Sequence, residues 1–138
     1  MSRPRERRVL VVDDMPDTRR LMRRVLESAG MTVLEAGSGE AAVEQIGTAR
    51  PSLVVLDLRL PGMSGFDVAR WVRAHHDRSV ADTILLACSA SVQPEIQREA
   101  LDAGCDAFEG KPFDIRGFAE RIRTMLDGRP GGLADPTG

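Results

Sequence analysis

Acidic, hydroxyl and amine side chains stand at the ends of the apolar runs in this sequence. Asp13 and Asp14 follow RVLVV, Asp57 follows LVVL, and Ser89 and Lys111 come after TILLA and AFE. A nucleophilic carboxylate, further carboxylates for a metal ion and two donors for developing negative charge are the parts of a phosphoryl-transfer site. These residue types therefore point to phosphoryl chemistry if the fold brings them together.

The three acids would repel one another strongly in a shared, partly desolvated cleft. A hard divalent cation, Mg²⁺ or alternatively Mn²⁺, would compensate this charge, because carboxylate oxygens are its preferred ligands. No His or Cys is placed to favour zinc. Lys111, the chain's only lysine among 19 basic residues, would offset part of the charge.

A repeating pattern of apolar run, turn and helical spacing must position these residues. The first, third and fourth runs are apolar almost throughout, as in parallel strands covered on both faces, whereas the second alternates and the fifth is weak. We expect strands at 8–12, 32–36, 53–56, 83–87 and 107–109.

Apolar residues at three- and four-residue spacing predict a helix after each strand. Ser38 can cap the second helix, which the Arg50–Pro51 pair would stop. Gly30 stands where a left-handed C-terminal cap is expected, and the fourth helix should end at Gly104. The five helices should contain residues 21–29, 42–46, 65–72, 96–101 and 115–126.

Strict alternation of strand and helix predicts an α/β fold. Five strands and five helices indicate an open, doubly wound parallel sheet, because a closed barrel of this type needs eight strands. In such sheets the ligand site lies beyond the carboxyl ends of the strands, where the chemically capable residues stand.

Composition fits one compact domain: the chain has 138 residues, 42% hydrophobic and 29% charged. A net charge of -2 gives no general attraction to nucleic acid or membrane surfaces. The chain has no bilayer-length apolar run, and its two cysteines are too few for a disulfide framework, so we expect a cytoplasmic location. We expect a flexible arm at 1–6, a domain at 7–127 and a flexible tail or linker at 128–138.

The residues and their spacing resemble the receiver domain of bacterial two-component response regulators, similar to the stand-alone chemotaxis regulator. The resemblance covers about residues 6 to 127 and implies a flavodoxin-like sheet with strand order 2-1-3-4-5. It rests on Asp13–Asp14, Asp57, Ser89–Ala90, PGMSGFD at Pro61 to Asp67, and Lys111–Pro112–Phe113.

The resemblance implies a role for each matching acid. Asp57 would be the phosphoacceptor, taking a phosphoryl group from a phosphohistidine, and would also contact the metal. Asp14 would bind Mg²⁺ directly, and Asp13 would act mainly through water. The backbone carbonyl of Arg59 would complete the protein's share of the metal ligands.

The resemblance also implies a switch. Ser89 and Lys111 would grip the phosphoryl oxygens, with the peptide before Pro112 in the cis form. Phe108 would turn inward when the Ser89 hydroxyl moves toward the phosphate, changing the face formed by the fourth helix, fifth strand and fifth helix. Because Phe108 lacks a tyrosine hydroxyl, a readout through a hydrogen bond from that ring is in doubt.

Further residues would modulate the site. By the same resemblance, Arg59 and Ser91 would flank the path of an attacking water, where an arginine would either shield or steady the phosphoryl group. The first helix carries a basic outer face, either a solvated surface or a docking site for a kinase, and we favour docking. This face consists of Arg19, Arg20, Arg23 and Arg24.

The implied partners are a sensor histidine kinase or histidine phosphotransfer protein and a downstream protein target, without direct contact to nucleic acid or membrane. A monomer or a weak phosphorylation-dependent dimer is expected. The resemblance implies a signalling domain rather than an enzyme, one that assists its own phosphorylation and dephosphorylation.

Single residues weigh against two rival classes. A phosphatase with an aspartyl-phosphate intermediate would have an acid two residues beyond Asp57, where Arg59 stands. A flavodoxin-type FMN carrier would have a Ser/Thr/Gly-rich loop in place of DDMPD. A receiver-like module that only dimerises, and a receiver excised from a hybrid kinase or multidomain regulator, remain alternatives.

Overall fold

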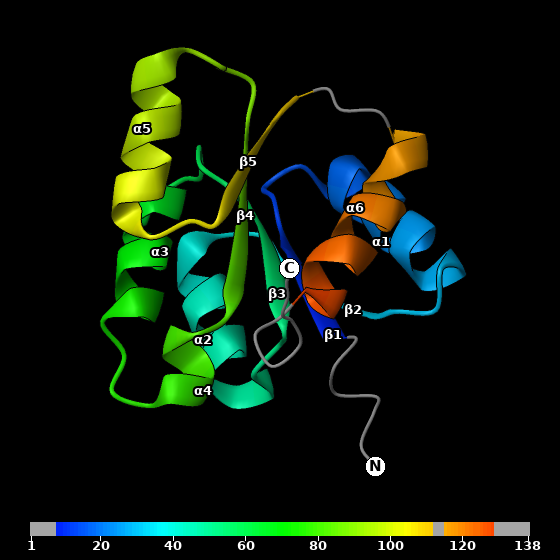
Figure 1. The fold of residues 1–138 in the computed structure, drawn as a ribbon, viewed down its shortest axis with the longest axis horizontal. Coiled ribbons are helices and arrows are strands. Elements are labelled where there is room, and N and C mark those ends of the chain that lie inside the picture. Colours follow the sequence, from blue (N-terminus) through cyan, green and yellow to red (C-terminus); the bar gives the residue numbers. More distant parts are fainter. Residues whose placement is uncertain (1–7, 112–114, 129–138) are drawn as a thin grey trace.

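The computed structural model describes residues 8–111 and 115–128 of the chain. Within them lies a five-stranded parallel sheet in the order β2-β1-β3-β4-β5 (Figure 1). This confirms the predicted α/β class, the open sheet and its strand order. The strands are β1 (Arg8–Val12), β2 (Thr32–Ala36), β3 (Leu53–Asp57), β4 (Ile84–Ser89) and β5 (Ala107–Gly110).

Helices cover both faces of the sheet because side chains in its strands point alternately to either side. In β1, Leu10 packs in one core layer and Val11 in the other. Helices α2, α3 and α5 cover one face of the sheet, and α1 and α6 cover the other (Figure 1). The helices are α1 (Pro16–Ser28), α2 (Gly39–Ala49), α3 (Gly65–Arg73), α4 (Arg78–Ala81), α5 (Pro94–Ala103) and α6 (Ile115–Asp127).

The described residues include one short helix in addition to the five that were predicted: α4, which lies between α3 and β4. Four residues are too few to show helical periodicity, and α4 depends on its cap instead. The hydroxyl and amide of Ser79 donate to Asp77, and with the Arg50 guanidinium they lower the pKa of Asp77 to about 2. In the sequence, the Asp-x-Ser pattern at Asp77 to Ser79 was the feature that could have indicated this helix.

Three predictions fall outside the described residues: the arm at 1–6, the cis peptide at Lys111–Pro112, and residues 129–138 of the tail. Among the helices that are described, none has the length and apolar character needed to cross a bilayer.

Candidate functional site

The turn after β1 carries two acids in different environments. Asp13 is fully buried, whereas Asp14 is exposed. The backbone N–H of Asp13 donates to the carbonyl of Ala36 at 3.2 Å, and its Oδ1 accepts from the backbone N–H of Met15 at 2.9 Å. Asp13 is therefore held by the end of β2 and by its own turn.

Asp57 is the last residue of β3 and is only 6% exposed. Its Oδ1 accepts a hydrogen bond from the backbone N–H of Arg59 at 3.0 Å. Desolvation is the largest influence on the pKa of Asp57 and raises it, although the Arg59 amide and the Lys111 charge act in the opposite direction. The carboxylate is thus poorly solvated in the folded protein.

Lys111 directly follows β5 and brings a cation to these acids. Its Nζ lies 2.6 Å from Oδ2 of Asp13 and 3.3 Å from Oδ2 of Asp57. Burial alone would lower the pKa of Lys111, but the hydrogen bond to Asp13 and the two carboxylate charges raise it overall. Lys111 therefore remains an ammonium ion between the two carboxylates.

A pocket of about 380 Å³ opens beside this cluster at the carboxyl ends of the strands. The open position agrees with the general rule for ligand sites in doubly wound sheets. Its lining residues are Asp14, Asp57, Arg59, Leu60, Pro61, Ala90 and Lys111.

Ser89 lies at the end of β4, one residue beyond Cys88, which is in register with Asp57. It is 5% exposed, and its hydroxyl accepts from the backbone N–H of Ser91 at 3.1 Å. The carbonyl of Ser89 accepts from the backbone N–H of Lys111 at 2.8 Å. The Ser89 hydroxyl thus bonds to the backbone of the loop after β4, and Ala90 of that loop lines the pocket.

The acids fit a hard divalent cation. One carboxylate oxygen from each of Asp13, Asp14 and Asp57 can be chosen so that all three lie within 4.8 Å of one another. Oxygen-only donors, two of them on buried residues, suit Mg²⁺ or Mn²⁺ better than softer metals.

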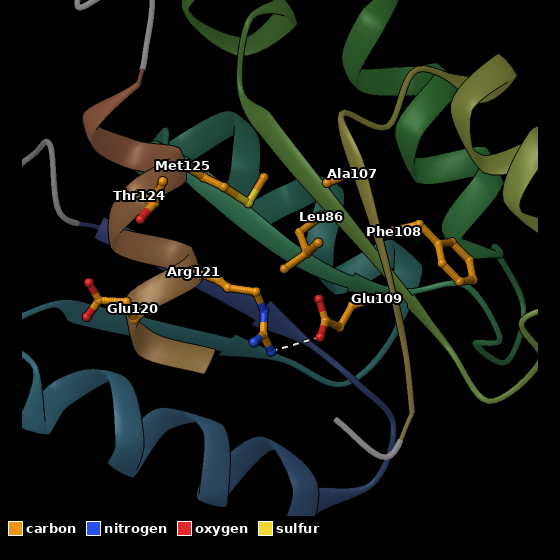
Figure 2. Close-up of a pocket in the computed structure, with 8 residues that line it drawn as sticks. All are labelled: Leu86, Ala107, Phe108, Glu109, Glu120, Arg121, Thr124 and Met125. Atoms are coloured by element: carbon orange, nitrogen blue, oxygen red, sulfur yellow. Dashed lines mark ion pairs between the residues drawn. The ribbon is translucent and has the colours of Figure 1, made fainter. Parts of the chain in front are cut away.

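Phe108 lies on β5 with its ring partly buried, and it packs against the core layer that contains α5. Figure 2 shows the ring on the opposite side of β5 from Arg121. On the Arg121 side, β5 and α6 enclose a mostly apolar groove of about 400 Å³, where Arg121 Nη2 lies 2.7 Å from Oε2 of Glu109. The strand therefore presents the ring to one layer and an ion pair to the other.

The interpretation of Arg19 as part of a basic outer face is wrong. Its side chain is only 20% exposed; it contacts Glu35 and donates from Nη1 to the carbonyl of Asp13 at 2.8 Å. Arg19 precedes the buried residues Met22 and Leu26 by three and seven positions, a spacing that places it toward their side of α1. That spacing was a usable signal in the sequence.

A family model described as the response regulator receiver domain matches residues 9–123. The DNA-binding response regulator MtrA of Mycolicibacterium smegmatis is 37% identical over 119 residues, which are 86% of this chain and 50% of that protein. Hybrid signal transduction histidine kinase C of Dictyostelium discoideum is 33% identical over 110 residues, 77% of this chain and 9% of that protein. This chain therefore spans half or less of the length of these two relatives.

Solved structures share the fold. The chemotaxis protein CheY4 of Vibrio cholerae has a TM-score of 0.77 at 27% identity, covering 85% of this chain and 96% of that one. The receiver domain of the Francisella response regulator 1452 has a TM-score of 0.78 at 25% identity, covering 87% and 96% of the two chains. The similarity in fold thus covers most of this chain.

Proposed function

This chain belongs to the response regulator receiver domain family, and on that premise we propose that Asp57 accepts a phosphoryl group from a phosphohistidine. The donor would be a sensor histidine kinase or a histidine phosphotransfer protein. The observation that carries the proposal is the distance of 3.3 Å between Lys111 Nζ and Asp57 Oδ2, in a pocket that Asp14 also lines.

In the proposed step a carboxylate oxygen of Asp57 attacks phosphorus while the P–N bond to the donor imidazole breaks. The electron pair of that bond returns to the imidazole nitrogen, which takes a proton from solvent. Because Asp57 is already desolvated, little water has to leave before attack. The Lys111 ammonium is close enough to stabilise the negative charge on the transferred oxygens.

We propose Mg²⁺, or Mn²⁺ in its place, as the cofactor. Asp14 and Asp57 would bind it directly, the Arg59 carbonyl would contribute a further oxygen, and Asp13 would act through water. When bound, the cation neutralises charge on the phosphoryl oxygens. The contact of Asp13 Oδ2 with Lys111 Nζ supports binding of Asp13 to the cation through water, because this oxygen is already paired with the ammonium.

The proposed readout starts from new acceptors on phosphorylated Asp57. The Ser89 hydroxyl would leave the Ser91 amide for a phosphoryl oxygen, drawing in the loop after β4. Phe108 would move into the vacated space, and the face formed by α5, β5 and α6 would change shape for a downstream protein. Ser91 and Arg59 would control access of hydrolytic water.

A second proposal is that the chain is the receiver part of a hybrid kinase or multidomain regulator, with the receiver unit at 7–127. It is favoured by the relatives, of which this chain covers 50% in one case and 9% in the other. The size of the native gene product distinguishes this from a single-domain regulator.

The direct test is incubation with acetyl phosphate and Mg²⁺, followed by intact-mass measurement and mapping of the modified residue. We expect a gain of one phosphoryl group at Asp57. When a chelator has removed the cation before incubation, we expect no such gain. An unmodified protein after incubation would contradict the proposal and favour the dimerisation module.

Lys111→Arg is expected to preserve the fold and phosphoryl uptake but to uncouple uptake from the switch. A broad guanidinium cannot occupy the place of a compact ammonium between Asp13 and Asp57 without crowding the phosphoryl group. Amide NMR shifts of Ser89 and Phe108, measured with and without acetyl phosphate, would report switching. Wild-type shift changes in the variant would contradict this expectation.

A further inference from the structure

Arg19 joins the acidic turn to the neighbouring strand. Its Nη1 donates to the carbonyl oxygen of Asp13 at 2.8 Å, and its Nε pairs with Oε1 of Glu35 on β2 at 3.0 Å. The side chains of Arg19 and Glu35 are only 20% and 24% exposed. Solvent therefore screens these contacts less than it screens an ordinary surface pair.

The carbonyl that Arg19 holds belongs to the peptide group linking Asp13 to Asp14. Because a peptide group is planar, fixing this oxygen also fixes the start of Asp14. On the other side of Asp13, its N–H donates to the carbonyl of Ala36 at 3.2 Å. Gly37 leaves room for the guanidinium, since a Cβ there would lie 3.1 Å from Nη1. The turn is thus clamped at both ends of Asp13.

Glu35 anchors Arg19 and balances its charge. The second carboxylate oxygen of Glu35 lies 3.0 Å from Nη1 of Arg23, which also pairs with Glu27. Hydrogen bonds from Arg23 and Arg19 lower the pKa of Glu35, so it remains ionised at neutral pH. Arg19 therefore brings little uncompensated positive charge to the acidic turn.

We propose that Arg19 is a positioning residue for the divalent cation site, holding the Asp13 carbonyl so that the Asp13 and Asp14 carboxylates point toward the cation. The inference rests on the proposed function because it assumes that this site binds a cation. Two effects oppose each other when Arg19 is removed. Losing a nearby positive charge would strengthen cation binding, whereas loosening the turn would weaken it, so the direction of the change reveals the role.

Mn²⁺ alone is the probe, with free Mn²⁺ measured by electron paramagnetic resonance in the unphosphorylated protein. Arg19→Met should raise the Kd for Mn²⁺ by about tenfold, as loss of groups that orient metal ligands commonly does. The matched control is Arg23→Met, which removes the same charge from the same helix and also a contact with Glu35, but leaves the acidic turn untouched. Its Kd should stay within about twofold of wild type, because exposed ion pairs contribute little.

Two further variants keep the inference falsifiable if Arg19→Met folds poorly. Arg19→Lys, which keeps a donor for the Asp13 carbonyl but loses the fixed spacing of the guanidinium donors toward Glu35, should restore part of the affinity. Glu35→Gln keeps Arg19 but removes its anchoring charge, and should weaken Mn²⁺ binding by a smaller factor. Unchanged or tighter Mn²⁺ binding in folded Arg19 variants would overturn the positioning role.

The two proposals fail separately. Weaker Mn²⁺ binding in Arg19→Met together with no phosphoryl uptake by the wild type would uphold the positioning role and reject phosphoryl acceptance by Asp57. Phosphoryl uptake by the wild type together with unchanged Mn²⁺ binding in Arg19→Met would do the reverse.

Discussion

Asp57→Asn is expected to lose phosphoryl uptake completely and, without divalent cation, to unfold at a higher temperature than the wild type. An amide is not a nucleophile toward phosphorus under these conditions, which accounts for the loss. The gain in stability follows from the burial of the Asp57 carboxylate, whose ionised form is penalised in the fold. The Asn oxygen can still accept the hydrogen bond from the Arg59 amide.

The pH dependence of this gain has a definite sign. Because folding raises the pKa of Asp57, the folded state binds its proton more tightly than the unfolded state does. The contribution of the Asp57 carboxyl to the free energy of unfolding is therefore fully present below the unfolded pKa of about 4. It falls as the pH rises toward the pKa in the folded state. The advantage of Asp57→Asn should grow over that window and then stay constant.

Thermal unfolding in the presence of a chelator measures the effect, and a gain of about 1 kcal/mol would raise Tm by about 4 °C in a domain of this size. Asp17→Asn is the matched control, since this carboxylate is 93% exposed and pairs with Arg20 at the surface. Its Tm should change little. A lower Tm for Asp57→Asn than for wild type would show that the Lys111 contact outweighs the desolvation.

Gly65→Ala is expected to destabilise the fold by about 2–4 kcal/mol, because the new Cβ would meet backbone atoms. Backbone atoms cannot move aside as the end of a flexible side chain can. A Cβ on Gly65 would overlap the carbonyl oxygen of Asp57 and lie 2.6 Å from Cα of Leu58. The N–H of Gly65 also donates to the carbonyl of Leu58 at 3.1 Å, so α3 begins directly against the loop that follows Asp57. Denaturant unfolding followed by the fluorescence of Trp71, the only tryptophan, measures the loss.

Gly47→Ala is the control for the same substitution in an open place. Gly47 lies inside α2, and a Cβ there would meet only Trp71 Cη2 at 3.9 Å, an ordinary contact. This variant should be more stable by about 0.5–1 kcal/mol, because alanine loses less backbone entropy in a helix. Equal stability of Gly65→Ala and wild type would mean that α3 can shift away from β3 at no cost.

The sheet and the meeting of the acids were predictable because both follow from patterns that extend over many residues. Apolar runs mark buried parallel strands, and the carboxyl ends of such strands share one edge, which brought Asp13 and Asp57 together with Lys111. The roles of these residues in phosphoryl transfer stay predictions.

The missed features depend on single contacts that periodicity does not encode. The helix α4 is held by the cap at Asp77, and Arg19 turns inward because a backbone carbonyl and Glu35 receive it. The orientation of the Ser89 hydroxyl toward the Ser91 amide likewise depends on the path of one loop. Helical spacing indicates the side of α1 on which Arg19 lies, but it does not indicate the two groups that Arg19 contacts there.

The bond between Lys111 and Asp13 also bears on when a newly made molecule becomes competent. It joins residues 98 positions apart, from the ends of the fifth and first strands. A chain still emerging from the ribosome, with β1 to β4 made, holds all three acids but lacks the ammonium between them. Contacts of such separation form late, after most of the chain has been ordered. Under the proposed function, the ability of Asp57 to accept a phosphoryl group is therefore acquired at the end of folding. Incomplete molecules would then not be phosphorylated.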